Sequence, residues 1–188
     1  MRLFVTVGNA PQPFDRLVGL VDEAIDRSGL DCTGVFQLGT ATSRPRHLDA
    51  ARILSRPEFE AALASADAVI CHAGVGTIFS ALRAGHRPIV VPRRHALGEH
   101  VNDHQTEIVA ALAEAGRIHA AHTADELVSA LHAVASGGRS VADLQTARSA
   151  ALAAIAPALS SAASPKPRQF LLRLLAALGP PLDELRLR

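Results

Sequence analysis

Short apolar runs alternate along most of the chain with longer segments in which apolar residues recur at helical spacing. The runs that predict strands are "LFVTV" (3–7), "GVFQLG" (34–39), "ADAVICH" (66–72), "RPIVVP" (87–92) and "RIHA" (117–120). The segments that predict helices are 13–27, 57–65, 77–84, 101–115 and a last one that begins after Thr123, with Glu126 completing a capping box. This alternation predicts a doubly wound α/β domain with a mostly parallel sheet covered by helices on both faces.

The pattern changes after "ASGGRS". An Ala- and Leu-rich stretch, 141–156, predicts a further helix, and "SSAASPKP" (160–167) is typical of a linker. We therefore expect a Rossmann-like domain over 1–160 and a linker with an amphipathic helix over 161–188. The apolar face of that helix needs a partner surface, which the sequence leaves open: the domain's own flank, a second subunit or a membrane.

Composition narrows the classes of partner. Nineteen basic and 18 acidic residues give a net charge of +1, and the chain has no Trp, no Tyr and only six Phe, which argues against nucleic acid. Cys32 and Cys71 lie far apart, so neither a disulfide scaffold nor a zinc ribbon is expected. The first residues indicate a strand rather than a signal peptide, and no apolar run is long enough to span a bilayer. These features predict a cytoplasmic protein.

The turn "HAGVGT" between a predicted strand and helix carries the chemistry of an anion site. Gly74 and Gly76 would let backbone amides approach a ligand, and the Thr77 hydroxyl would cap the helix and donate to an oxyanion. Glycines that merely form a tight turn are the alternative on this motif alone. The dinucleotide fingerprint is excluded because Phe79 stands at the third glycine position, and no Walker lysine is present.

Two further loops should open on the same edge of the sheet, because the carboxyl ends of parallel strands lie together. They are "GNAPQP" (8–13) and "PRRHALGEHVNDHQ" (92–105). With these loops in place, "FVTVGN", "ADAVICHAGVGTIFSALRAGHRPIVVP" and "GEHVNDHQ" together resemble the C-terminal, donor-binding domain of family 28 glycosyltransferases, in particular its small stand-alone subunits.

The resemblance implies the C-terminal half of a GT-B glycosyltransferase with a UDP-sugar as donor. It implies inverting transfer of a hexose, GlcNAc- or glucuronate-like, to a lipid-linked or saccharide acceptor, with no obligatory cofactor or metal. The acceptor would be bound by a partner subunit, which could hold the protein at the inner face of a membrane. The resemblance leaves homo-oligomer formation open.

Residue roles follow from the same resemblance. His72 is the expected catalytic residue, because a partial positive charge there would favour the departing UDP. The expected nucleotide and diphosphate contacts are Gly8, Asn9, Gly74, Val75, Gly76, Thr77 and Ser80. The expected sugar contacts are His104, Gln105 and Glu99.

Ser80 departs from the family, which commonly has a glutamate that accepts from both ribose hydroxyls. A serine cannot make that two-pronged contact. Either Glu99 or Asp103 holds the ribose, or the affinity for UDP is reduced. A non-catalytic nucleotide-sugar-binding or regulatory subunit is therefore the alternative function. A nicotinamide-dependent oxidoreductase is disfavoured, because the strand at 34–39 ends without an acidic residue for the ribose.

Other polar residues have simpler interpretations. His100 and His104 are four apart on an expected helix, but Val101 stands where a metalloprotease motif needs glutamate, so no metal site is predicted. Arg93 and Arg94 are expected to be solvated loop charges, and a clamp on the ligand is the alternative that their place at the edge of the sheet leaves open. Cys71 should lie in the core, because neighbouring strand residues point to opposite faces.

Overall fold

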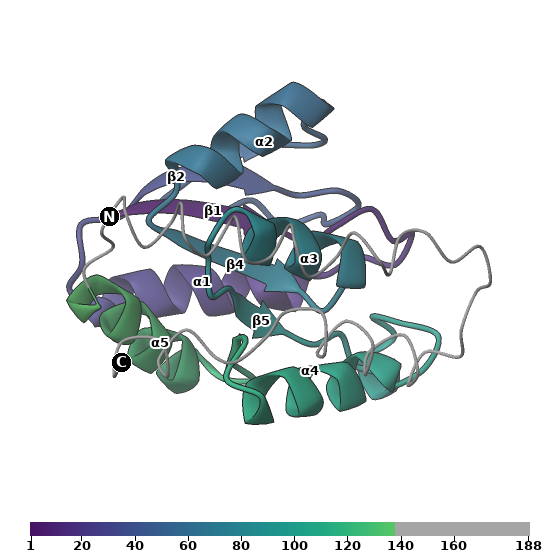
Figure 1. Cartoon of the computed structure of the whole chain (residues 1–188). Coiled ribbons are helices and arrows are strands. Elements are labelled where there is room, and N and C mark those ends of the chain that lie inside the picture. The colour runs from purple at the N-terminus through teal and green to yellow at the C-terminus, as the bar shows by residue number, and fades with distance from the viewer. Residues whose placement is uncertain (138–188) are drawn as a thin grey trace.

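The computed structural model describes residues 1–137 (Figure 1). The strands are β1 (Arg2–Thr6), β2 (Thr33–Gln37), β3 (Asp49–Ala51), β4 (Ala68–His72), β5 (Ile89–Val91) and β6 (His119–Ala120). The helices are α1 (Asp15–Ser28), α2 (Arg56–Ser65), α3 (Val75–Arg83), α4 (His104–Glu114), α5 (Ala124–Ser136) and the short 3-10 turn η1 (His95–Leu97). The predicted domain boundary at 160 and the two predicted C-terminal helices lie outside the described residues.

The six strands form one parallel sheet in the order β3-β2-β1-β4-β5-β6. The chain first builds outward from β1 to β3 and then returns to the other side of β1 with β4. The direction of winding therefore reverses between β1 and β4, and a crevice outside the carboxyl ends of these two strands is where open α/β sheets bind ligands. The predicted doubly wound class is confirmed, and every pairing is parallel.

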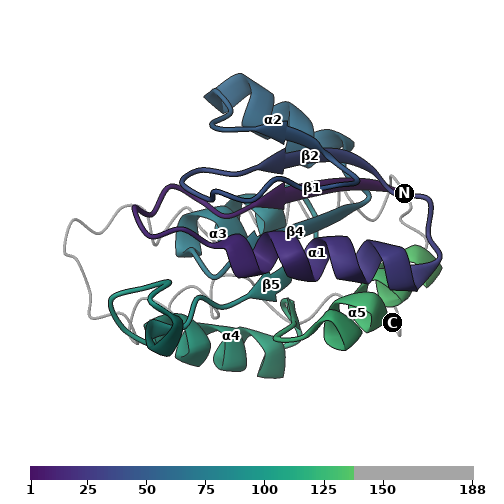
Figure 2. The ribbon, with the colours of Figure 1, turned by 180° about the vertical axis from the view of Figure 1, so that it is seen from behind.

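Helices cover both faces of the sheet, as Figures 1 and 2 show from opposite sides. The alternation of β1 explains the two layers. Leu3 and Val5 belong to the core shared with α1 and α5, while Phe4 points to the other face and meets Phe59 of α2 edge-on at 5.1 Å between ring centroids. On that second face, a separate cluster joins β4 and β5 to α3 and α4 through residues such as Ile78. The sheet is thus buried on both sides.

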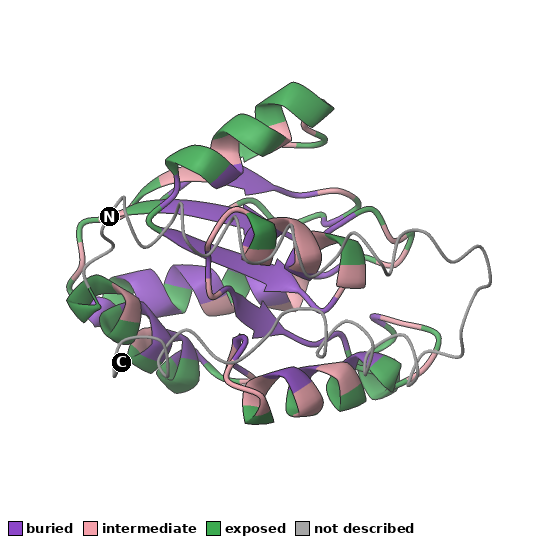
Figure 3. Cartoon of the chain, viewed as in Figure 1, coloured by how far each residue is buried: buried purple, intermediate pink, exposed green. Residues whose placement is uncertain are grey.

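Strand β4 is buried at every position (Figure 3), as the uninterrupted apolar run predicted. Cys71 is fully buried, and burial raises the pKa of its thiol to about 12. It remains protonated at neutral pH and is a packing residue. The prediction that Cys71 lies in the core is confirmed.

Several boundaries differ from the sequence-based expectation for physical reasons. Strand β3 was not predicted, because Asp49–Ala51 is short, polar at its start and poor in β-branched residues. Helix α3 begins at Val75 rather than Thr77. Helix α4 begins at His104 rather than 101, since the preceding residues form a loop. The capping box of Thr123 and Glu126 at the start of α5 is confirmed.

Candidate functional site: a crevice at the carboxyl ends of β1 and β4

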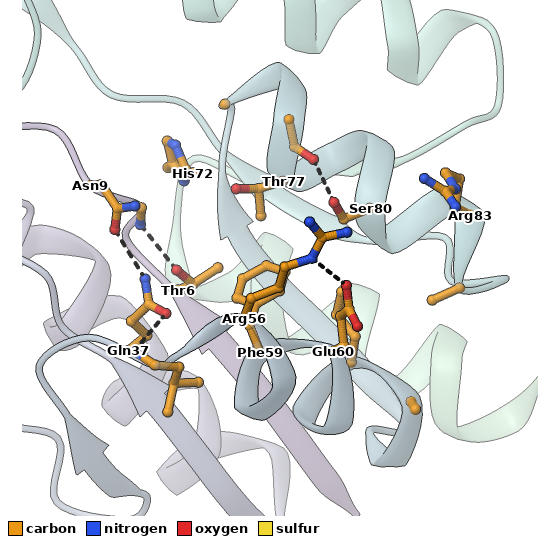
Figure 4. Close-up of a pocket in the computed structure, with 17 residues that line it drawn as sticks. Thr6, Asn9, Gln37, Arg56, Phe59, Glu60, His72, Thr77, Ser80 and Arg83 are labelled. Atoms are coloured by element: carbon orange, nitrogen blue, oxygen red, sulfur yellow. Dashed lines mark hydrogen bonds and ion pairs between the residues drawn. The ribbon is translucent and has the colours of Figure 1, made fainter. Parts of the chain in front are cut away.

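A crevice of about 960 Å³ opens where β1, β2 and β4 end, between α2 and α3 (Figure 4). Its volume is at the upper end of the range for small-molecule sites, about 300–1,000 Å³. The sequence-predicted residues that line it are Gly8, Asn9, His72, Gly74, Gly76, Thr77 and Ser80. The structure therefore brings the loop after β1 to the same cavity as the turn after β4 and the start of α3, which lie far from it in sequence.

His72 lies with its imidazole between two glycines. A Cβ added to Gly8 would come within 2.2 Å of His72 Cε1, and one added to Gly74 within 2.2 Å of Nε2. Gly8 also has φ of 77°, a left-handed conformation that favours glycine. Both glycines are thus required by the packing of the protein itself, because any side chain at either position would displace the ring.

The environment of His72 favours its neutral form. Burial, together with a smaller effect of the positive charge of Arg93, lowers the pKa of His72 to about 4, while a contact with the Thr6 backbone acts in the opposite direction. Its Nδ1 is buried and has no hydrogen-bond partner of ordinary geometry among the described residues. At neutral pH the imidazole therefore carries a polar N–H group but no full charge. The partial positive charge predicted for this position would therefore be that of an N–H group on a neutral ring, not the full charge of an imidazolium.

Gly76 differs from the other two glycines, because a Cβ added there would meet no atom within 4 Å. Gly76 is exposed and faces the crevice at the start of α3, whose N-cap, Gly74, offers no side-chain hydrogen bond. The first amides of a helix have no partner within the helix, and the helix dipole adds partial positive charge there. This end of α3 is suited to a phosphate or another anion.

Thr77 and Ser80 both lie on the crevice side of α3 (Figure 4). Thr77 is the third residue of the helix and makes no capping hydrogen bond, so the predicted capping role is wrong and its hydroxyl stays available to a ligand. The Ser80 hydroxyl donates to the Gly76 carbonyl at 2.9 Å. Ser80 can therefore offer a ligand only an acceptor oxygen.

The loop after β1 is fixed by a short chain of hydrogen bonds. The Gly8 amide donates to Thr6 Oγ1 at 3.0 Å, so this amide is already engaged. Gln37 of β2 donates through Nε2 to Asn9 Oδ1 at 3.3 Å, and its Oε1 accepts from the Leu54 amide at 3.4 Å. The Asn9 side chain is thus oriented with its oxygen held, which leaves its amide N–H groups for a ligand.

The wall opposite α3 is built by α2, which sequence reasoning missed as part of the site. Arg56 and Glu60 form an ion pair with an Nε–Oε1 distance of 3.0 Å on the exposed side of α2, and Phe59 contributes an aromatic edge. Arg83, at the end of α3, completes this part of the lining. The i,i+4 spacing of Arg56 and Glu60 was visible in the sequence, but nothing in it placed α2 beside the glycine turn.

Four predicted site residues do not line the crevice: Val75, Glu99, His104 and Gln105. Both Glu99 carboxylate oxygens accept from Arg16, each at 2.8 Å, which explains why Glu99 is held away from the cavity. Gln105 is buried and accepts from the Arg93 amide at 3.0 Å, whereas His104 is exposed at the start of α4. The sugar contacts assigned to these residues stay predictions.

Ribose binding by Asp103 or Glu99 has no support in this geometry, since the Asp103 carboxylate accepts from the His95 amide at 3.0 Å outside the crevice. Glu60 is instead the one carboxylate among the described residues that line it. The carboxylate in the crevice therefore comes from α2.

Arg93 corrects another expectation. It was predicted to be a solvated loop charge together with Arg94, but only Arg94 is exposed, and the Arg93 side chain is completely buried. His100 and His104 do not share a helix face, because α4 begins at His104. Among residues 1–137, no group of three or more His, Cys, Asp or Glu side chains is placed to hold a metal ion.

The parallel sheet, its strand order and the crevice define an α/β domain of the kind that forms the C-terminal half of GT-B glycosyltransferases. The chain belongs to the family described as Glycosyltransferase family 28 C-terminal domain, which matches residues 2–160. No curated protein matches the chain by sequence. No helix within residues 1–137 has the length and apolar character needed to cross a bilayer.

Solved structures agree on the fold. The glycotransferase of kitacinnamycin is 19% identical with a TM-score of 0.56, and alignment covers 99% of this chain and 41% of that one. CalG4, the calicheamicin glycosyltransferase, is 16% identical with a TM-score of 0.55, covering 99% and 42%. SnogD from Streptomyces nogalater is 19% identical with a TM-score of 0.52, covering 98% and 41%. The chain thus spans about two fifths of the length of these structures.

Proposed function

We propose that this chain is the donor-binding part of a glycosyltransferase and that its crevice holds a UDP-sugar. The observation that carries the proposal is the open space beside Gly76. No neighbouring protein atom requires a glycine there, and the absence of a side chain opens the amides of α3 to the cavity. Family membership over residues 2–160 supports the same reading. The choice of uridine rests on the sequence resemblance.

The proposed chemistry is direct displacement with inversion of a hexose, GlcNAc- or glucuronate-like, onto a lipid-linked or saccharide acceptor. The acceptor oxygen forms a bond to the anomeric carbon, the bond from that carbon to the diphosphate breaks, and the acceptor proton passes to a base. Amides at Gly76 and Thr77, the dipole of α3 and the neutral N–H of His72 would stabilise the departing diphosphate. No metal or cofactor is required for this set of contacts.

The ribose contact in this proposal falls to Glu60. Ser80 offers one acceptor oxygen, since its proton is used within α3. Glu60 lies across the crevice from Ser80 and carries a carboxylate that can accept from two neighbouring hydroxyls (Figure 4). Its partner Arg56 would stay beside it and limit repulsion of the diphosphate.

The base and the acceptor site would come from a second, acceptor-binding subunit facing this edge of the sheet. Two large apolar side chains in the loop after β5 support such a contact, because Leu97 is 55% and Val101 is 69% exposed. Association of that partner with the inner face of a membrane would give this chain a peripheral location.

Binding measurements test the proposal. Calorimetry should show saturable binding of UDP and of at least one UDP-hexose, and no binding of NAD under the same conditions. UDP binding without sugar transfer, in the presence of every candidate partner, would favour the second candidate, a nucleotide-sugar-binding regulatory subunit. The Ser80 hydroxyl, which is engaged within α3, favours this candidate. Binding of NAD in place of UDP would contradict the proposal.

A further inference from the structure

Arg93 is the largest completely buried side chain of the described residues and the mechanism above does not use it. Its guanidinium lies over the ring of Phe14, with 4.7 Å from Cζ to the ring centroid. A charged group removed from water is costly unless hydrogen bonds compensate it. The burial of this charge must therefore be explained by the groups that the guanidinium contacts.

The guanidinium joins the two loops that flank the crevice edge. One terminal nitrogen, Nη1, donates to the carbonyl oxygens of Gln12 at 2.7 Å and Glu99 at 2.9 Å, and Nη2 donates to the Val7 carbonyl at 2.9 Å. Val7 and Gln12 bracket the loop after β1, and Glu99 belongs to the loop after β5. Only a planar fork with several fixed donors can reach three carbonyls in this arrangement, which a lysine ammonium cannot reproduce.

The loop after β5 is in turn fixed around Arg93. Arg16 binds the Glu99 carboxylate through two nitrogens and donates to the Pro92 carbonyl at 2.8 Å. The backbone amide of Arg94 donates to the same carboxylate at 2.9 Å. Because Glu99 is bound in this way, the Arg93 guanidinium itself contacts carbonyl oxygens, and its positive charge stays without a directly bonded carboxylate among the described residues.

We propose that Arg93 is a positioning residue of the donor site: it holds residues 7–12 in the shape that places Gly8 against His72 and Asn9 in the crevice, and it supplies buried positive charge behind the diphosphate-binding edge. The proposal rests on the proposed function. Gly8 and Asn9 lie between the two carbonyls that Arg93 binds, so the guanidinium sets the path of the chain at both ends of that loop. Its charge also acts on His72, which supports its closeness to the crevice.

Two substitutions separate geometry from charge. Arg93→Lys keeps the charge and loses the fork, whereas Arg93→Met keeps comparable bulk and loses both. Arg94→Met is the matched control, because it removes the same charge from the neighbouring exposed position. Each variant is measured for binding of UDP and of uridine, and the ligand-free proteins for amide hydrogen exchange at residues 7–12.

Arg93→Lys should weaken the binding of UDP about tenfold, because a lysine cannot hold the carbonyls at both ends of residues 7–12 and the loop that carries Gly8 and Asn9 is then misplaced. The affinity for uridine should change less than about twofold. Exchange at residues 7–12 should accelerate in Arg93→Lys and not in Arg94→Met. Arg93→Met should weaken the binding of UDP further; if this variant fails to fold, Arg93→Lys carries the test.

Three results would overturn the proposal: equal losses of affinity for UDP and uridine, unchanged amide exchange at residues 7–12 in Arg93→Lys, or an equal effect of Arg94→Met. Failure of the wild-type protein to bind UDP would overturn the proposed function, and the exchange measurement would then decide alone whether Arg93 holds the loop.

Discussion

The crevice has a packed half and an open half, and the same residue type serves opposite purposes in them. In the packed half, Gly8 and Gly74 are glycines because the His72 ring occupies the space of a side chain. In the open half, Gly76 leaves space that no protein atom fills. Glycines two residues apart in one motif therefore have different physical explanations: Gly74 is required by packing against His72, whereas Gly76 leaves open space at the start of α3.

A methyl group added in the packed half should have the largest effect on the protein. Gly8→Ala should lower the free energy of unfolding by about 3 kcal/mol, because overpacking and a strained positive φ act together. Urea unfolding measures the loss. Gly74→Ala should be rescued in part by a simultaneous His72→Ala, since removal of the ring frees the space. Additive losses in that double variant would contradict the proposed contact.

The buried ring predicts a second large effect, on pH dependence. The pKa of His72 in the folded protein, about 4, lies below the ordinary value of 6.5. As the pH falls, the unfolded chain therefore takes up the proton first, and the free energy of unfolding should fall between pH 6.5 and pH 4 by up to about 3 kcal/mol. His72→Gln should lose this part of the pH dependence. Parallel stability curves for wild type and variant would show that His72 is not held neutral by the fold.

The open half should respond in binding rather than in stability. Gly76→Val should weaken UDP by about 2 kcal/mol, because the side chain blocks the approach to the amides of α3. Its unfolding free energy should change by less than about 1 kcal/mol, since nothing occupies that space in the protein. Calorimetry and urea unfolding of the same sample check both halves of this statement. A stability loss as large as that of Gly8→Ala would erase the distinction between the two halves.

The smallest effect is expected on the α2 wall. Glu60→Gln should weaken UDP by about 1 kcal/mol, the scale of one hydrogen bond, and should have less effect on 2′-deoxy-UDP, which lacks one of the two hydroxyls. Arg56→Gln is the companion control for the ion pair itself. Equal losses of affinity for UDP and 2′-deoxy-UDP in Glu60→Gln would show that Glu60 does not contact the ribose.

The fold was largely predictable, because burial on both faces leaves a simple signature. The continuous apolar run of β4 and the capping box before α5 both appear in the structure as expected. Asp49–Ala51 was missed, since a three-residue strand at the sheet edge carries little pattern. The glycine turn was also recognisable, because strand, turn and helix are consecutive in sequence.

The rest of the site depends on contacts between distant segments, which no local pattern encodes. Arg93 is 86 residues from the Val7 carbonyl that it binds, and it was therefore mistaken for a surface charge. Glu99 was assigned to the ligand because its pairing with Arg16, 83 residues away, was not visible. The opposite wall on α2 was missed for the same reason.

The most direct test of the central claim is a titration of ¹⁵N-labelled protein with UDP, followed by backbone amide shifts. We expect saturable changes at Gly74, Gly76 and Thr77, with smaller ones at Asn9 and along α2. A smaller hollow of the described residues lies beside β6 and α5 and is lined by residues such as Ile118 and Ser129. Changes confined to that hollow, or no saturable change at any residue, would contradict a donor site in the crevice.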